Sequence, residues 1–384
     1  MATHKDVTDE SGAVVYYYTR EKKDGPYKAN LPPKTTVSYV KQLLDVFLPA
    51  GYPYTVTADY TPYQIYDSLQ AFSSSIAGLM SNRAVLQGFG VGKEGSSATG
   101  AVLLSVLQES TGRLATIVFA HRFGQAIEPE CKYYRFMADI FNDAALLLDI
   151  LTPSLPQEPK IIALCAAGIL RSLCGVAAGA AKASLSAHFA KTGNLAELNA
   201  KDGSQETVIS LLGMLAGSVI VNFVEGTTAV WLSMFFLLGV HLWTNYQAVR
   251  SVQMRSLNRQ RTCIVVDEYH KSGRIMRPAE VAKVERILTW EGPDIDFATS
   301  LPETLPYDWI LSLKKEPFMI AYTTRGARIY LRKGATNLDA LEAYARAHSG
   351  YVFEKEFFKA LASAGWDLDA GAVETGRAIR IALE

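Results

Sequence analysis

The sequence predicts a mainly α-helical protein in which a helical membrane domain, either polytopic or a single hairpin, is followed by a small soluble α+β domain. One observation is the distribution of charge: residues 61–250 carry 12 basic and 13 acidic side chains, whereas the shorter segment 251–384 carries 19 and 18. The other is a pair of segments, 207–224 and 226–249, that contain no Asp, Glu, Lys or Arg. Each is long enough as a helix to cross about 30 Å of hydrocarbon.

Three parts follow from this distribution: a soluble N-terminal lead-in over residues 1–60, the membrane domain over 61–250 and the α+β domain over 251–384. Lys and Arg together number 38, as do Asp and Glu, and this balance argues against a nucleic-acid partner. The four cysteines show no CxxC spacing and the histidines show no metal-ligand spacing. Neither a disulfide framework nor a metal site is therefore expected.

The N-terminal lead-in lacks the apolar stretch of a secretory leader. We expect a strand over residues 14–18 and a short helix over 40–47. Four later segments have helical patterns but carry charges: 62–81, 100–120, 132–151 and 161–181. Either all of them span, giving about six membrane helices with polar groups turned inward, or they form an amphipathic bundle docked on one membrane hairpin.

Basic residues predict the orientation of the membrane domain. Four arginines follow the second uncharged segment and two lysines precede the first: Arg250, Arg255, Arg259, Arg261, Lys191 and Lys201. Positive charge collects on the cytosolic side of membrane helices. We therefore expect a multi-pass membrane protein in contact with the lipid bilayer, with its C-terminal domain facing the cytosol.

The C-terminal domain is expected to hold strands over residues 262–267, 318–323 and 327–331. Helices are expected to begin at Arg277-Pro278 and to run over 338–347 and 354–364. The sequence contains no GxSxG elbow, no P-loop lysine and no HExxH. The chain is therefore expected not to be an enzyme.

Polar side chains share single faces of two apolar helices. On segment 62–81 these include Asp67 and Gln70, and on segment 132–151 they include Asp139, Asn142 and Asp143, at steps of three or four residues around Arg135. Arg171, alone in its segment, is expected to pair with Asp67, Asp139 or Asp143. These six residues predict a polar intramembrane site: Asp67, Gln70, Asp139, Asn142, Asp143 and Arg171. Structural ion pairs or solvated helix faces are the alternatives.

A polar stretch at 199–207 lies directly before the first uncharged segment and is expected to be a loop. Its candidate residues are Lys201, Asp202, Ser204, Gln205 and Glu206. Ser204 and Thr207 could cap the following helix, with Asp202 and Glu206 at its positive end. A contact with a headgroup or substrate at the cytosolic mouth is the alternative.

Two glycine patterns stand out. Residues 90–95 match GxGxxG, but no alternating strands and helices surround them, so a loop between helices is favoured over a dinucleotide site. The pairs Gly175/Gly179 and Gly213/Gly217 lie in apolar segments, where small residues let two helices approach closely.

Several longer strings identify a resemblance: LPAGYP at 48–53, VTADY at 56–60, GFGVG at 88–92, RFMADIFND at 135–143 and AKDGSQET at 200–207. They resemble the root UVB sensitive family, whose domain is also named for vitamin B6 photoprotection and homeostasis. The likeness covers roughly residues 40–290. It implies membrane association and supplies no catalytic residues.

The leading functional hypothesis is a non-enzymatic membrane protein that acts in small-molecule, vitamin B6-related homeostasis as a transporter-like module. It requires no cofactor. The first alternative is a membrane-anchored scaffold whose C-terminal domain binds a protein partner. A third is a sensor or enzyme that binds pyridoxal phosphate through a lysine such as Lys201.

Overall fold

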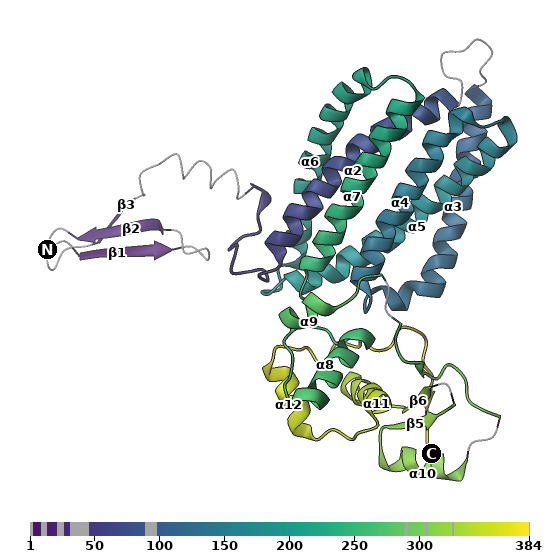
Figure 1. Cartoon of the computed structure of the whole chain (residues 1–384). Coiled ribbons are helices and arrows are strands. Elements are labelled where there is room, and N and C mark those ends of the chain that lie inside the picture. Colours follow the sequence, from purple (N-terminus) through teal and green to yellow (C-terminus); the bar gives the residue numbers. More distant parts are fainter. Residues whose placement is uncertain are drawn as a thin grey trace.

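The computed structural model describes residues 3–8, 14–20, 27–30, 46–88, 98–288, 291–303, 306–324 and 326–383. Its largest part is a bundle of long helices that run up and down in turn, with the C-terminal domain at one end (Figure 1). The bundle helices are α2 (Tyr60–Gly88), α3 (Ala98–Ile127), α4 (Cys131–Leu151), α5 (Gln157–Phe189), α6 (Leu195–Phe223) and α7 (Thr227–Ser251). The predicted fold class, mainly α with a small α+β region after the bundle, is confirmed.

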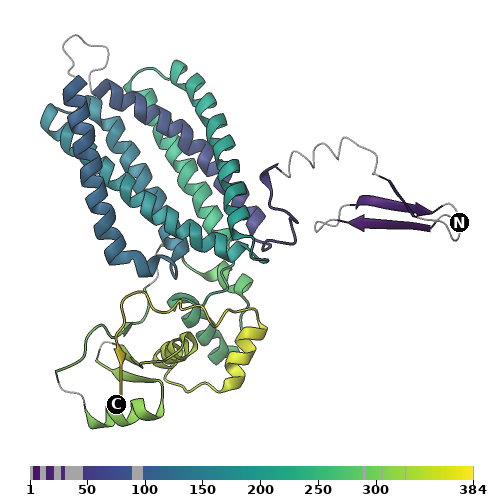
Figure 2. The same ribbon diagram turned by 180° about the vertical axis from the view of Figure 1, so that it is seen from behind.

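Two polar helices form the centre of the bundle. α2 packs against α4, α6 and α7, and α4 packs against α2, α5 and α7, while α3 lies on the outside against α5. The view from behind shows α3 and α6 at opposite edges (Figure 2). Buried polar and charged side chains concentrate on α2 and α4. The more apolar helices therefore surround the polar ones.

Four helices are long and apolar enough to cross a membrane: residues 102–127 of α3, and the whole of α5, α6 and α7. Their outer faces expose large apolar side chains, among them Leu114, Ile117 and Val118 on α3, Leu211, Leu215 and Phe223 on α6, and Phe235 and Phe236 on α7. Soluble proteins seldom expose apolar faces of this extent. The faces match the hydrocarbon of a bilayer.

One glycine pair permits close helix packing and the other does not. A Cβ atom on Gly213 would lie 2.8 Å from the carbonyl oxygen of Phe72 in α2, and one on Gly217 would lie 3.3 Å from the Cα of Ile76. A Cβ on Gly175 or Gly179 would meet no atom within 4 Å. The predicted role in packing is thus confirmed for Gly213 and Gly217 and wrong for Gly175 and Gly179.

The polar stretch at 199–207 is helical, so its prediction as a loop is wrong. α6 begins at Leu195 with Asn194 before it. The hydroxyls of Ser204 and Thr207 donate to the carbonyls of Ala200 and Gly203, one turn back in the same helix, and therefore do not cap it. The helix extends because its polar first turns find partners on α2, α5 and residues 46–47 rather than in water.

The C-terminal domain is a small sheet with helices packed on it. Strands β4 (Ile295–Phe297), β6 (Ala327–Arg332) and β5 (Phe318–Tyr322) lie side by side in that order, and β7 (Arg380–Ile381) pairs with β6. The helices are α8 (Arg259–Ser272), α9 (Pro278–Val284), α10 (Tyr307–Lys315), α11 (Asn337–Ser349) and α12 (Lys355–Ser363). A separate antiparallel sheet contains β1 (Thr3–Thr8), β2 (Val14–Arg20) and β3 (Lys28–Asn30).

One predicted strand is wrong: residues 262–267 lie in helix α8. The side chain of Asn258 accepts a hydrogen bond from the Arg261 N–H and caps the start, and Gly273 ends the helix in the left-handed conformation. Both signals lie outside the short apolar run that suggested a strand. The predicted glycine-rich run 90–95 and residues 40–45 of the predicted helix 40–47 lie outside the described residues.

A buried ion cluster joins the C-terminal domain to the bundle. Glu285, just after α9, lies 2.8 Å from Lys132 Nζ of α4 and 2.6 Å from Arg261 Nη2 of α8. All three side chains are almost fully buried. Burial alone would raise the pKa of Glu285, but the charges of Arg261 and Lys132 lower it to about 2. The cluster ties α4 to α8 and to the end of α9 in the C-terminal domain.

The two glycine pairs make a matched test of helix packing. Gly213→Ala is expected to destabilise the protein by roughly 1–3 kcal/mol, because the new methyl meets the backbone of α2. Gly175→Ala meets open space and is expected to raise stability by up to about 1 kcal/mol through helix propensity. Thermal unfolding in detergent measures both. Equal effects would contradict the assigned packing.

Stability is expected to fall in acid through Glu285. Its pKa is about 2 in the folded protein against an ordinary 4.5, so its contribution is complete above about pH 4.5 and is lost as the pH falls toward 2. The full effect is on the order of 3 kcal/mol. Melting curves between pH 7 and pH 3 should show about 2 kcal/mol of this loss, and Glu285→Gln should be less stable at pH 7 but flatter with pH. An unchanged pH slope in that variant would refute the assignment.

Candidate functional site

A single arginine organises the centre of the bundle. Arg135 of α4 donates from Nη2 to Asp67 of α2 at 2.7 Å and from Nη1 to Asp139, one turn on in α4, at 3.0 Å. Its Nη2 also donates to the Gln70 side-chain oxygen at 2.8 Å. The Gln70 amide in turn donates to Asp139. One cation thus holds two carboxylates and an amide from the two polar helices.

Helix α7 closes this arrangement with a histidine and an asparagine. His241 Nδ1 lies 2.8 Å from Asp143 Oδ1, and its Nε2 lies 3.2 Å from the Gln70 amide nitrogen. One turn along α7, Asn245 donates to Asp139. Because the Gln70 nitrogen is a donor, Nε2 of His241 accepts and Nδ1 carries the proton. Nδ1 lies at ion-pair distance from Asp143 but makes no hydrogen bond of normal geometry with any described residue.

Some buried polar atoms at this centre have no hydrogen-bond partner within the described part of the chain. They include Asp143 Oδ2 and Asn245 Oδ1, whose side chains are 4% and 1% exposed. Both atoms are acceptors. A buried acceptor without a donor costs roughly 1–3 kcal/mol, so the centre is not fully satisfied by the protein itself.

A cavity of about 320 Å³ opens beside Arg135. Its walls come from α2, α4, α5, α6 and α7, and the polar or charged residues among its lining are Asp67, Gln70, Ser74, Ser75, Arg135, Asp139, Asn142, Lys182, Glu206, Ser210 and His241. Cys174 of α5 also faces it. Space of this size can hold a small molecule.

A second ion cluster stands at one side of the cavity. Lys182 Nζ of α5 lies 2.8 Å from both Asp202 Oδ2 and Glu206 Oε2 of α6. The Gln64 amide of α2 donates to Asp202 as well. Lys182 thereby holds α6 to α5 beside the cavity.

The end of the bundle near the C-terminal domain carries one more buried pair. His188 Nε2 lies 2.9 Å from Asp59 Oδ2, which also accepts the Gln253 N–H at 2.6 Å. Burial alone would raise the pKa of Asp59, but the hydrogen bond and charge of His188 and the bonds from neighbouring groups lower it to about 2. This pair joins the start of α2 to the ends of α5 and α7.

The prediction for the ion-pair partner of Arg171 is wrong. Arg171 pairs with Asp149 near the far end of α4, not with Asp67, Asp139 or Asp143. Asp149 is fully buried and also accepts the Ser81 hydroxyl at 2.6 Å. The first two carboxylates are already held by Arg135, and Asp143 faces His241. Arg171 therefore lies outside the central cavity.

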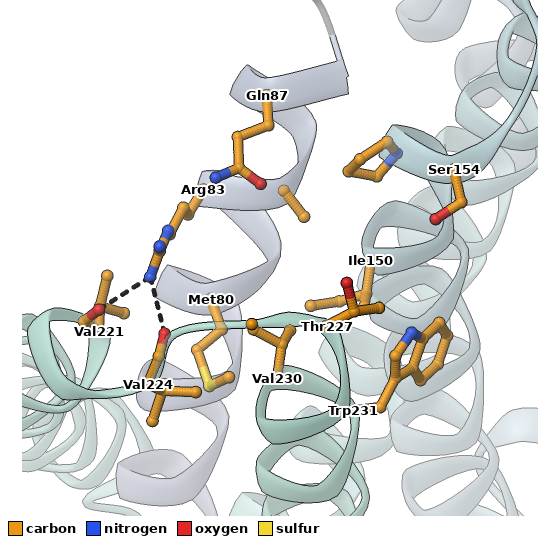
Figure 3. A pocket seen from close by; sticks show the side chains of 13 residues that line it. Met80, Arg83, Gln87, Ile150, Ser154, Val221, Val224, Thr227, Val230 and Trp231 are labelled. Carbon is orange, nitrogen blue, oxygen red and sulfur yellow. Dashed lines mark hydrogen bonds between the residues drawn. The ribbon is translucent and has the colours of Figure 1, made fainter.

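A second cavity, of about 250 Å³, lies at the end of the bundle away from the C-terminal domain. There Arg83 of α2 donates to the carbonyls of Val221 and Val224 at the end of α6, opposite Trp231 of α7 (Figure 3). Its described lining includes no Asp or Glu. The two cavities thus differ in charge.

The structure brings together most of the residues predicted to share a site. Asp67, Gln70, Asp139 and Asn142 line the central cavity, and Asp143 contacts its wall through His241. Of the stretch predicted as a cytosolic loop, Asp202 and Glu206 join the Lys182 cluster, whereas Lys201 and Gln205 donate to the carbonyls of Val46 and Phe47. Ser204 only bonds its own helix. The functional role of all these residues stays a prediction.

Sequence reasoning missed Lys182, His241 and Asn245 as members of the site. A signal existed for two of them, since His241 and Asn245 are four residues apart and share one face of an otherwise apolar helix. For Lys182 the partner is on another helix, and spacing could not reveal it. Among the described residues, no group of three or more His, Cys, Asp or Glu side chains could hold a metal ion.

Comparisons with known proteins agree with one another. The family model described as the vitamin B6 photo-protection and homoeostasis domain matches residues 33–273. RUS family member 1 of Dictyostelium discoideum is 40% identical over 250 residues, 64% of this chain and 47% of that protein. Protein root UVB sensitive 3 of Arabidopsis thaliana is 31% identical over 328 residues, 80% of this chain and 74% of that protein. The chain thus spans about half the length of the Dictyostelium relative. No solved structure matches it.

Substitutions around Arg135 should be graded in effect. Arg135→Gln leaves Asp67 and Asp139 buried without a cation and is expected to cost roughly 3–5 kcal/mol. Asp67→Asn leaves Arg135 paired with Asp139 and should cost less, about 1–2 kcal/mol. Thermal unfolding of the purified variants in detergent measures the difference. A cost for Asp67→Asn equal to or above that of Arg135→Gln would contradict the central role of the arginine.

Proposed function

We propose, from the premise that this chain belongs to the root UVB sensitive family, that it is a non-enzymatic, multi-pass membrane protein. In this proposal it serves as a transporter-like module in small-molecule homeostasis related to vitamin B6. The matched domain, whose description refers to vitamin B6 homoeostasis, covers the whole helical bundle. The small molecule is proposed to bind in the central cavity.

The observation that carries the proposal is the cavity beside the buried Arg135 cluster, whose walls include three of the four apolar helices, α5, α6 and α7. Charged groups inside membrane helices are costly and typically mark binding sites or pathways. Transporters commonly bind their substrates near the middle of the bilayer, between helices of the bundle. The cavity contacts α2 about midway along that helix. This corresponds to the middle of the bilayer, where a transporter's binding site is expected.

Polar groups also extend from the cavity toward both ends of α2. Asp59 and Gln64 precede Asp67, and Ser81 and Arg83 follow it, each in contact with another helix or its connection. At 1.5 Å per residue, the distance from Asp59 to Arg83 is about 36 Å, close to the thickness of a bilayer. Polar groups in contact with neighbouring helices thus occur along the whole length of α2, and this supports a route across the membrane rather than an isolated pocket.

The proposed orientation places the C-terminal domain in the cytosol. Lys191, Arg250 and Arg255 lie at the end of the bundle that carries this domain, as the distribution of positive charge favours. Arg259 and Arg261 support it less, because they are engaged with Asp296 and Glu285 inside the C-terminal domain and its junction.

The scaffold alternative assigns partner binding to the C-terminal domain. Exposed Tyr322, Tyr351 and Val352 on that domain are the features that favour it. However, the Glu285 cluster makes the domain part of one structural unit with α4. Removing the domain would leave Lys132 buried without its carboxylate, so a truncation cannot separate the two functions.

A pyridoxal phosphate site fits the residues poorly. Lys201 donates to the Val46 carbonyl and is not among the residues that line the central cavity. The cavity has more carboxylates than cations around it, and these oppose a phosphate group. We therefore derive no chemistry through this cofactor.

Blocking the cavity tests the transporter proposal. Ser74→Phe places a ring in the central cavity and is expected to abolish uptake of radiolabelled pyridoxine and pyridoxamine into vesicles that contain the purified protein. Leu69→Phe lies on an exposed part of the same helix and should retain more than about half of the activity, because the cavity stays open.

Three readouts decide the outcome: uptake, the amount of protein in the vesicles and its melting temperature. No uptake of either compound by the native protein would refute the vitamin B6 transporter. Equal uptake by Ser74→Phe and native protein would show that the cavity is not the route.

A further inference from the structure

We infer that the central cavity binds a small organic cation, such as a protonated amine, in preference to an anion. The inference rests on the proposed function, because it names the ligand class of the same cavity. It depends on three features: which hydrogen-bond donors are occupied, which acceptors are unoccupied, and how the fixed charges sum.

The permanent cations beside the cavity are engaged with carboxylates. Arg135 donates to Asp67, Asp139 and Gln70, and its Nε lies 3.4 Å from the Tyr63 hydroxyl. Lys182 is held between two carboxylates of α6. An anionic ligand would have to displace a carboxylate from one of these cations, and such charge-assisted hydrogen bonds are the strong ones.

Two of the atoms left without partners are acceptors, and the third at this centre, His241 Nδ1, already lies 2.8 Å from Asp143 Oδ1. Asp143 Oδ2 and Asn245 Oδ1 have no donor within the described part of the chain, and both belong to side chains that contact cavity-lining residues, His241 and Asp139 respectively. A ligand with N–H groups would supply the missing donors. A phosphate or carboxylate ligand would add acceptors where acceptors are already in excess.

The fixed charges sum to a negative value. Five carboxylates line the cavity or contact its lining residues: Asp67, Asp139, Asp143, Asp202 and Glu206. They face two permanent cations, Arg135 and Lys182, and His241, so the carboxylates are in excess whether His241 is neutral or protonated. A cavity with low-dielectric walls focuses such an imbalance and concentrates the opposite charge by about 10–1,000-fold. The ligand that compensates it is a cation.

The native Cys174, which lines the cavity, provides a test that needs no knowledge of the substrate. In a Cys165→Ala background, Cys131 and Cys263 stay buried and Cys174 is the thiol beside the cavity. Its rate of modification is measured with a cationic reagent, 2-aminoethyl methanethiosulfonate, and an anionic one, 2-sulfonatoethyl methanethiosulfonate. Each rate is divided by that of the same reagent with free 2-mercaptoethanol, and mass spectrometry identifies the modified cysteine.

We expect the cationic reagent to react with Cys174 about tenfold faster than the anionic one. Asp143→Asn should reduce this preference several-fold. Glu206→Gln, at a half-exposed position that carries little risk to folding, should reduce it as well. The matched control is Ser154→Cys in a Cys165→Ala, Cys174→Ala background, because Ser154 lines the far cavity beside Arg83. There the preference should be absent or reversed.

Equal rates at Cys174, or a faster anionic reagent, would overturn the inference. If neither reagent modifies Cys174, the same comparison is made with Ser74→Cys and Ala178→Cys, which also line the cavity, and inaccessibility at all three positions would likewise overturn it. The result is independent of uptake. Cation preference without transport would refute the transporter and retain the cation site. Transport without cation preference would refute the cation site and retain the transporter.

Discussion

The fold depends on compensation of the buried positive charge of Arg135. A guanidinium among apolar helices is stable only where carboxylates meet it, and here they come from α2 and from the next turn of α4, with α7 bonded to the same carboxylate. This requirement fixes how the three helices are placed along one another. A shift of α2 by one turn would separate Asp67 from Arg135 and leave both charges in the apolar interior.

Helix α4 also contacts the rest of the chain through buried charges that are compensated by partners on other segments. Lys132 lies one turn before Arg135 on α4, and its partner Glu285 also holds Arg261, so the C-terminal domain is attached through a second compensated charge. Further along α4, Asp143 faces His241 and Asp149 faces Arg171 and Ser81. The buried charges of α4 thus meet partners on every neighbouring part, and the apolar helices need only cover them.

Much of the bundle could be predicted because its signals are local. Charge-free length identified α7, and steps of three and four residues placed Asp67 with Gln70, and Asp139 with Asn142, on shared faces. The predictions that were wrong concern features that depend on residues far away in the sequence. The start of α6 is set by contacts of Asp202 and Gln205 with other segments, and the partner of Arg171 is decided by which carboxylates Arg135 already holds. The cap at Asn258 turned an apparent strand into α8, although the residues involved were visible in the sequence.

Two unsatisfied acceptors next to a cavity distinguish the Arg135 centre from the other buried ion clusters. Ion clusters that only stabilise a fold gain by satisfying every buried group, since each unsatisfied one costs roughly 1–3 kcal/mol. In the Glu285 cluster both carboxylate oxygens bond a cation, and the atom left without a hydrogen bond, Arg261 Nη2, still lies 2.6 Å from that carboxylate. The Arg135 centre instead leaves Asp143 Oδ2 and Asn245 Oδ1 without donors and keeps a cavity beside them. A ligand with N–H groups would satisfy these acceptors, and its positive charge would compensate the excess of carboxylates around the cavity. For this reason the cavity is the functional part of the bundle in the proposed function.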